Sequence, residues 1–178
     1  MPEIFKNSVT RRAGDATSDT GASIAANATS ITALTSTAGV EVGDLVDNQH
    51  FLNGTKVTVV GANDVTVDTA SLNTATATNQ AVSLLGMTTA FTATEKSILI
   101  GGTFTNNTRN QVQLSVELLD SSAGVSAQLV GRVPVPSGSS FVLSDSGKTV
   151  IEVNDEIRVY CNTADAIDVS LAILEGVN

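Results

Sequence analysis

The stretch Gln111-Val112-Gln113-Leu114-Ser115-Val116-Glu117-Leu118 alternates polar and apolar residues without a break. Successive side chains of a β-strand point to opposite faces of a sheet, so this period of two predicts a strand with one buried face. The same alternation recurs on both sides of that stretch. It is found at 30–34, 56–59, 64–68 and 81–84, and further predicted strands centre on 98–104, 128–133, 140–143, 149–153, 156–161 and 167–174. No stretch shows a helical period with capping residues, so the sequence predicts an all-β protein.

Composition and turn residues divide the chain into three predicted parts. Residues 1–27 are dense in Ala, Ser, Thr, Asp and Gly, which bury little surface, and they predict an extended N-terminal arm. Residues 28–86 hold short alternating runs and predict a small antiparallel β-domain that ends near Gly86. Residues 87–178 hold longer runs and predict a two-sheet β-sandwich, either jelly-roll or immunoglobulin-like.

Two turns in different parts of the chain have related sequences. They are Val40-Glu41-Val42-Gly43-Asp44-Leu45-Val46 and Ile151-Glu152-Val153-Asn154-Asp155-Glu156-Ile157. In each, an apolar-Glu-Val strand end meets a tight turn that carries Asp, and Gly43 and Asn154 are residue types that tolerate positive φ. A duplicated domain or recurring turn chemistry explains the similarity, and we favour the turn chemistry.

The net charge of −9 excludes several classes of partner. A protein that binds nucleic acid needs a basic face to displace counterions from phosphates, and a membrane-surface helix needs a cationic face. We therefore expect neither nucleic acid nor membrane as a partner. The 178 residues include 42% hydrophobic but only 3% aromatic side chains. Two small aliphatic cores are marginal alone, which favours an oligomer.

The charge is unevenly placed along the sequence. Residues 1–12 carry Lys6, Arg11 and Arg12 against Glu3, a net of +2, and the remainder therefore carries −11. An arm with this charge is suited to an acidic neighbour, including another copy of the chain, although a frayed, solvated terminus explains it equally well. The arm also carries apolar residues that need a groove. Arg158 and Tyr160 share the predicted outward face of their strand, and exposed Tyr and Arg are enriched at interfaces. The predicted partner interface comprises Ile4, Phe5, Lys6, Val9, Arg11, Arg12, Arg158 and Tyr160.

The side chains that support catalysis are scarce. His50 is the one histidine, and although Asp47 lies near it in the sequence, no nucleophile motif accompanies the pair, so we interpret it as a polar loop residue. Cys161 shares the apolar face of its strand with Ile157 and Val159 and is interpreted as an inert core thiol. We expect no catalytic residue, no cofactor and no metal site. One cysteine excludes an internal disulfide, and neither a secretory signal nor an apolar run of membrane-spanning length is visible.

The residues from 91 to 174 resemble a β-sandwich that recurs in virion structural proteins of tailed phages, especially those of marine bacteria and cyanobacteria. The resembling pieces are 98–106 (ILIGGTFTN), 113–118 (QLSVEL), 133–140 (VPVPSGSS), 151–159 (IEVNDEIRV) and 168–175 (DVSLAILE). Residues 30–85 are similar to a small β-module of phage and bacterial surface proteins. The resemblance implies a non-catalytic particle subunit that decorates heads, forms collars or necks, or attaches tails. Its implied partners are itself, as a homo-oligomer, and other virion proteins, and its implied location is the virion.

Two other classes of function stay open at this point. A fibre-tip or adhesin-like module would recognise a surface glycan, although sugar sites favour aromatic platforms and the chain has no Trp and one Tyr. A hydrolytic enzyme would need His50 in a site that the sequence does not otherwise indicate.

Overall fold

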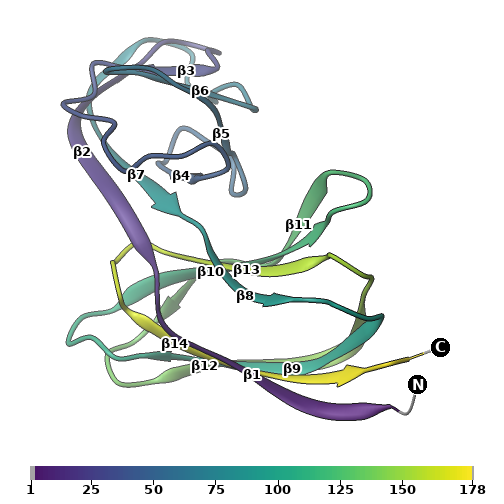
Figure 1. Cartoon of the computed structure of the whole chain (residues 1–178). Coiled ribbons are helices and arrows are strands. Elements are labelled where there is room, and N and C mark those ends of the chain that lie inside the picture. The colour runs from purple at the N-terminus through teal and green to yellow at the C-terminus, as the bar shows by residue number, and fades with distance from the viewer. Residues whose placement is uncertain (1–2, 178) are drawn as a thin grey trace. The chain divides into compact units, whose positions relative to one another are not determined.

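The computed structural model describes residues 3–177, and the side chains of all of these except residues 145–147. The described chain forms fourteen β-strands and no helix, which confirms the all-β prediction (Figure 1). The strands divide into two compact units. One unit combines the residues up to Gly14 with those from Thr88 onward, and the other is Asp15–Met87.

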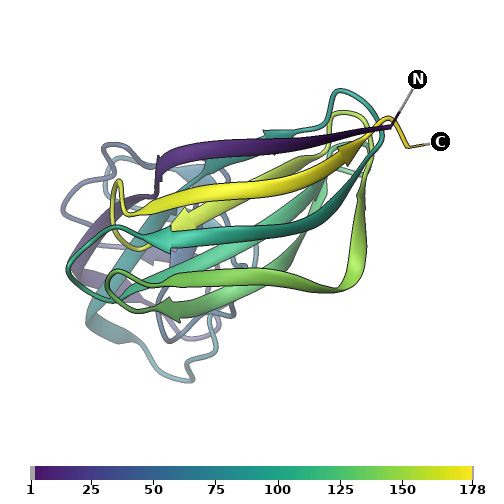
Figure 2. The same ribbon diagram turned by 90° about the horizontal axis from the view of Figure 1, so that it is seen from below.

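The first unit is a sandwich of two four-stranded sheets. Sheet 1 has the order β1 (Ile4–Ala13), β14 (Ile167–Glu175), β9 (Ser97–Asn106) and β12 (Ser140–Ile151). Sheet 2 has the order β11 (Val125–Val135), β10 (Val112–Asp120), β13 (Glu156–Cys161) and β8 (Thr88–Thr92). Figure 2 shows sheet 1 from below, with β1 in purple beside β14 in yellow. The sandwich prediction is therefore correct.

The pairing of these eight strands follows one rule. The first strand of the sandwich pairs with the last (β1 with β14), the second with the seventh (β8 with β13), the third with the sixth (β9 with β12), and the fourth with the fifth (β10 with β11). All four pairs are antiparallel, so the eight strands of the sandwich form one long hairpin that folds over into two sheets. This is the topology of a jelly roll, which decides between the two sandwich types that the sequence left open.

The core between the two sheets is aliphatic, as the composition requires. Strand β10 places Val112, Leu114 and Val116 in it, the apolar positions of the alternating stretch, and Phe104 of β9 is the largest apolar side chain there with no exposed surface. Strand β14 contributes every second residue, from Ile167 to Ile173. The alternation read from the sequence therefore gives the correct buried face of these strands.

The structure differs from the expectation of a separate N-terminal arm over residues 1–27. Residues 4–13 are strand β1, paired along β14, and residues 15–24 are strand β2 (Asp15–Ile24) of the second unit. Ala13, Ala22 and Ile24 are completely buried. Small side chains bury little area each, but a strand also gains backbone hydrogen bonds from a partner distant in sequence, which composition does not reveal.

The second unit is a six-stranded sheet that closes on itself. Its order is β4 (Leu45–Asp47), β7 (Ala77–Gly86), β2, β3 (Ser30–Thr32), β6 (Val65–Val67) and β5 (Val57–Val60). The two ends of this order meet where Leu45 bridges Lys56, and Val57 N donates to Asp44 O at 2.9 Å. Closure removes the open edges of the sheet and surrounds a core that includes Ile24, Ile31 and Phe51.

The second unit is an insertion in the sandwich. The chain leaves the sandwich after Gly14 and re-enters it at Thr88, so the insertion lies in the connection between β1 and β8. Within the second unit, Asp15 pairs with Gly86 in antiparallel strands, so its two ends lie side by side. The sequence-based boundaries, at residues 28 and 87, therefore differ from the observed ones mainly at the N-terminal side, where β2 belongs to the insertion.

The two related turns have the same geometry, one in each unit. Gly43 has a φ of 102° and Asn154 a φ of 70°, as their residue types predict. In each turn the Asp side chain accepts a hydrogen bond from the backbone N–H of the Glu three residues before it, at 2.9 Å for Asp44 and 3.0 Å for Asp155. The surrounding sheets have different strand orders, so the similarity reflects turn chemistry and not a duplicated domain.

Candidate assembly interface

The outer face of sheet 1 carries apolar side chains on all four of its strands. Along β14 the core residues alternate with residues that point away from the core, among them Ser170, Ala172 and Leu174. Residues directly opposite one another in paired strands point to the same face, so the strand register gives the other outward residues. The register therefore identifies the residues of the outer face in rows that run across the four strands.

The first row crosses the whole sheet with apolar residues only. Phe5 pairs with Leu174, Leu174 with Ile98, and Ile98 with Val150. Phe5 is 77% exposed and Val150 is 46% exposed, although both are large apolar side chains. We call Phe5, Leu174, Ile98 and Val150 the apolar row.

A second row with an apolar residue at each end lies four residues further along β1 and β14. Val9 pairs with Ser170, Ser170 with Thr103, and Thr103 with Val142. Val9 is 65% exposed and Val142 is 56% exposed. The row between the two is small and uncharged: Asn7, Ala172, Gly101 and Ser144.

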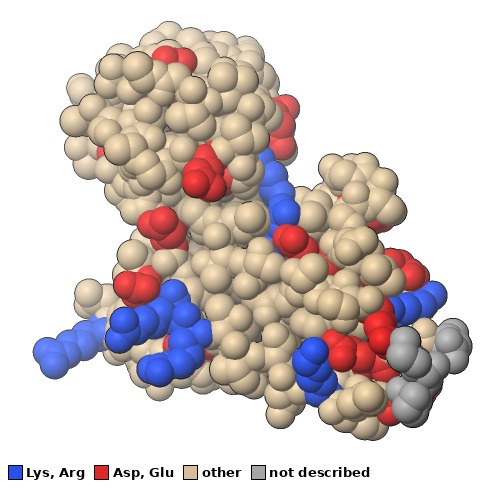
Figure 3. Space-filling model, in the orientation of Figure 1, with Lys and Arg blue, Asp and Glu red and all other residues tan. Residues whose placement is uncertain are grey.

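The outer face is large enough to act as a contact surface. Four strands ~4.8 Å apart, over ~5 residues of ~3.3 Å each, span ~300 Å². The largest apolar patch on a typical soluble monomer covers about 300–600 Å² and is often functional. Figure 3, which shows another side of the molecule, has basic and acidic side chains in small neighbouring groups of both signs.

Sequence reasoning missed Ile98, Leu174, Val142 and Val150, although a signal for them was present. Ser97-Ile98-Leu99-Ile100 and Leu171-Ala172-Ile173-Leu174 carry apolar residues at consecutive positions. Consecutive apolar residues in a strand place apolar groups on both faces, so one set must lie away from the core of a two-layer sandwich. The structure shows which set that is.

Strand β1 brings several predicted interface residues to the edge of this face. Of the predicted set, Phe5 and Val9 lie on this face and are 77% and 65% exposed, whereas Ile4, which is 57% exposed, pairs with Glu175 and points to the opposite face of sheet 1. Two of the basic residues of β1 form ion pairs within the chain: Lys6 Nζ lies 3.1 Å from Glu175 Oε1, and Arg11 Nε lies 3.9 Å from Asp168 Oδ2. The basic N-terminus is thus attached to its own acidic body along β14.

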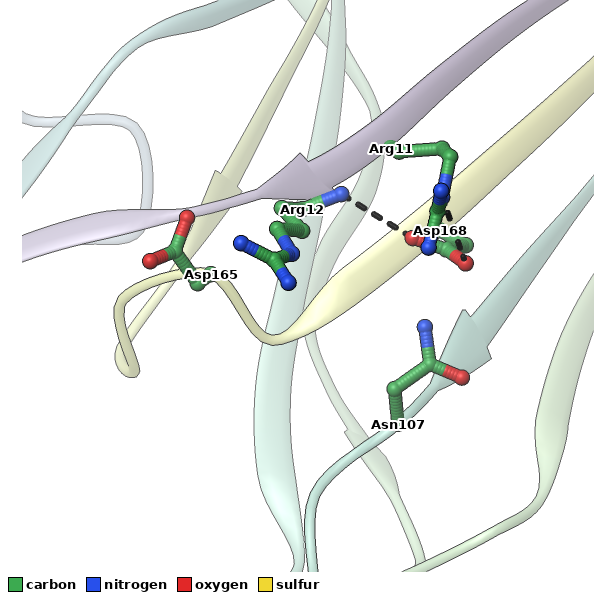
Figure 4. A pocket seen from close by; sticks show the side chains of 5 residues that line it. All are labelled: Arg11, Arg12, Asn107, Asp165 and Asp168. Atoms are coloured by element: carbon green, nitrogen blue, oxygen red, sulfur yellow. Dashed lines mark hydrogen bonds and ion pairs between the residues drawn. The ribbon is translucent and has the colours of Figure 1, made fainter.

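A shallow polar pocket lies where β1 ends its regular pairing. It is lined by Arg11, Arg12, Asn107, Asp165 and Asp168, and Figure 4 shows the Arg12 side chain between the two aspartates. The pairing of β1 with β14 is irregular between Thr10 and Ala13, and Arg12 has a φ of 57°.

Asp168 is the best-anchored acidic group of this pocket. The Arg12 backbone N–H donates to Asp168 Oδ1 at 2.9 Å, and this bond, with the nearby Arg11 and Arg12 charges, holds the pKa of Asp168 below its ordinary value. The pocket offers both signs of charge and suits polar or zwitterionic groups.

Arg158 and Tyr160 do not belong to this surface, which corrects the predicted interface. They lie on the face of β13 opposite the sandwich core, as expected, but Tyr160 has no exposed surface. Its hydroxyl donates to Glu117 Oε1 at 2.6 Å, and Arg158 Nε lies 2.8 Å from Glu156 Oε2. Burial raises the pKa of Tyr160, and the Glu117 contact raises it further. Both residues are engaged within the sandwich.

The two side chains considered for chemistry have other surroundings. His50 Nε2 lies 3.1 Å from Gln80 Oε1 in the second unit, a polar contact between side chains. Cys161 is buried in the sandwich core, and burial raises the pKa of its thiol, as expected for an inert core cysteine. Among the described side chains, which exclude those of residues 145–147, no group of three or more His, Cys, Asp or Glu is arranged to hold a metal ion.

The described residues also contain no helix of the length and apolar character needed to cross a membrane. No protein-family model, curated protein or solved structure matches the chain.

Proposed function

We propose that this chain is a non-catalytic structural subunit of a tailed-phage particle, acting as a head-decoration, collar or neck, or tail-attachment protein in the virion. It would work by contact with copies of itself and with other virion proteins. The observation that carries this proposal is the outer face of sheet 1, with its uncharged rows and its exposed Phe5, Val9, Val142 and Val150. Large apolar side chains that remain exposed in a row across a sheet are costly unless another protein covers them.

Two further points support a role in assembly. Eight-stranded jelly rolls occur in viral capsid proteins, although a fold alone does not define a function. The resemblance of residues 91–174 to tailed-phage structural proteins points to the same class. Both points are consistent with repeated contacts between modest surfaces in a symmetric assembly.

The test replaces apolar residues on the proposed contact face. Val142→Glu with Val150→Glu places two carboxylates on the outer face of sheet 1, where the side chains are already exposed, so the sandwich is expected to fold. The double variant is expected to lose at least tenfold in incorporation into particles. Val59→Glu is the matched control, since Val59 is 57% exposed and lies in β5 of the second unit. Equal incorporation of the double variant and the wild type would overturn the proposal.

A glycan-binding module is the alternative, and one observation favours it. Jelly rolls also occur in lectins, and the pocket of Arg11, Arg12, Asn107, Asp165 and Asp168 offers polar groups of the kind that bind sugar hydroxyls. Glycan-array binding that is lost on Asp168→Ala, in a protein that stays monomeric, would favour this function over assembly.

A further inference from the structure

Strand β1 is the one edge of the sandwich that is regular over most of its length. The sandwich has four edge strands: β1 and β12 in sheet 1, and β8 and β11 in sheet 2. The pairing of β8, β11 and β12 with their neighbours is interrupted by register shifts, and β11 also contains Pro134. Bulges and prolines blunt an edge against pairing with another chain. β1 keeps a regular register from Ile4 to Thr10.

The outward backbone groups of a regular edge strand can pair with an identical strand. Two β1 strands related by a two-fold axis run antiparallel. Because successive side chains alternate between the two faces, the outer faces of the joined sheets lie on the same side only if the axis passes between a residue and the same residue of the second copy. A residue then faces its own symmetry mate. This condition leaves few registers for β1.

The register centred on Asn7 is self-complementary. It places Phe5 opposite Val9 of the second copy, and Val9 opposite Phe5 of the second copy. It also places Glu3 opposite Arg11 of the second copy, twice by symmetry. Aromatic residues opposite β-branched residues, and opposite charges across strands, each stabilise a pair of strands.

The neighbouring registers lack these matches. Centring on Lys6 places two Lys6 side chains opposite each other, which is repulsive. Centring on Ser8 places Phe5 opposite Arg11 of the second copy and leaves no basic residue of the second copy opposite Glu3. Of these three registers, the one centred on Asn7 best matches the charges and apolar residues of β1.

We propose that two copies of the chain pair through β1, antiparallel about a two-fold axis at Asn7. Sheet 1 of one copy and sheet 1 of the other then join into one eight-stranded sheet. This inference rests on the proposed function and specifies the contact between copies. The apolar row of one copy then continues into the row of Val9, Ser170, Thr103 and Val142 of the other. Strand addition of this kind supplies backbone hydrogen bonds, while the facing side chains set the register.

Cross-linking tests the register directly. Asn7 is exposed, and in the proposed dimer Asn7→Cys lies opposite itself, with Cα atoms about 4.5–5.5 Å apart, within the range of a disulfide. Asn7→Cys is expected to form a disulfide-linked dimer under mild oxidation of the full chain. Phe5→Cys and Val9→Cys are the matched controls, since each lies ~13 Å from its own symmetry mate and is expected not to cross-link. Phe5→Cys combined with Val9→Cys is expected to cross-link again.

A charge swap tests the same pairing without cysteine. Glu3→Arg places Arg opposite Arg11 of the second copy and is expected to raise the dimer dissociation constant at least tenfold in sedimentation analysis. Adding Arg11→Glu is expected to recover affinity. The Arg11–Asp168 ion pair is lost in that variant, so the recovery is judged against Arg11→Glu alone, which is expected to bind more weakly than the double variant.

The outcomes separate this inference from the proposed function. If the protein self-associates but Asn7→Cys cross-links no better than Phe5→Cys, the β1 pairing is wrong and the assembly function stands. If the full chain is monomeric at all concentrations and absent from particles, both are wrong. Cross-linking of Asn7→Cys together with failure of both controls supports the pairing.

Discussion

The hydroxyl of Tyr160 donates a 2.6 Å hydrogen bond to Glu117 Oε1, and both side chains are buried. The two residues belong to neighbouring strands of sheet 2, where Glu117 is in register with Arg158 and Tyr160 with Ser115. Arg158 Nη1 lies 3.9 Å from Glu117 Oε1. The sequence predicted Tyr160 for a partner interface. In the structure, Tyr160 instead donates a hydrogen bond to a buried carboxyl group of its own sheet.

Tyr160→Phe is expected to destabilise the sandwich. The change keeps the ring but removes the donor to Glu117, and leaving a buried polar group less satisfied costs about 1–3 kcal/mol of unfolding free energy. Urea denaturation measures the loss. In a double-mutant cycle with Glu117→Gln, a coupling energy of about 1 kcal/mol or more is expected, and additive effects would show that the hydrogen bond does not contribute.

The stability of the second unit is expected to depend on the protonation of Asp44. The pKa of Asp44 is raised from 3.8 to about 6, mainly by burial and also by the charges of Glu41 and Asp15, while the hydrogen bond from the Glu41 N–H lowers it. Because the folded state binds this proton more tightly than the unfolded state, the contribution of Asp44 to the stability of the second unit is most favourable below pH 4. It is lost as the pH rises through the interval from about 4 to about 6.

Asp44→Asn is expected to remove that dependence while keeping an oxygen to accept the Glu41 N–H. At pH 7 the variant should gain on the order of 1–3 kcal/mol, since one pKa unit corresponds to about 1.4 kcal/mol. Denaturation of the variant and the wild type from pH 4 to 7.5 gives the difference in their unfolding free energies as a function of pH. Glu41→Gln, which removes one of the charges that raise this pKa, should move the transition to lower pH. A difference curve that is flat with pH would contradict the assignment.

Gly14→Ala is expected to destabilise the junction at the end of β1. Gly14 has a φ of 117°, and a Cβ there would lie 2.5 Å from the Thr163 carbonyl oxygen and 2.8 Å from Cys161 Cβ. Backbone strain together with overpacking should cost about 2–4 kcal/mol. Gly124→Ala is the matched control, because Gly124 also has positive φ, 67°, but nothing lies within 4 Å of its Cβ position. Equal losses in the two variants would attribute the effect to φ alone.

Removal of residues 3–13 is expected to unfold the sandwich instead of releasing a folded body. β1 supplies the partner of β14 along most of its length and buries Ala13, so its loss exposes the edge of β14 and opens the core beside it. Thermal denaturation followed by circular dichroism should lose its cooperative transition or show aggregation. A truncated protein that melts like the full chain would mean that β1 is an accessory strap, as composition suggested.

Much of the local structure could be predicted from the sequence. The period of two identified the strands and the buried faces of residues such as Leu114 and Val116. The residue types at Gly43 and Asn154 indicated positive φ, and the apolar face around Cys161 indicated its burial. These features depend on neighbours within a few residues, which the sequence displays directly.

Partners distant in sequence decided the rest. The alternation within a strand gives its two faces but not the strand beside it, so the position of β1 on β14, the insertion of residues 15–87 and the choice of a jelly roll came only from the tertiary structure. The same limit applies to side chains: Tyr160 is buried and hydrogen-bonded to Glu117, whereas Phe5 and Val150 are the two exposed ends of the apolar row. Backbone pairing between segments up to 171 residues apart, such as Ile4 with Glu175, has no local signature, because any strand edge offers the same hydrogen-bonding groups.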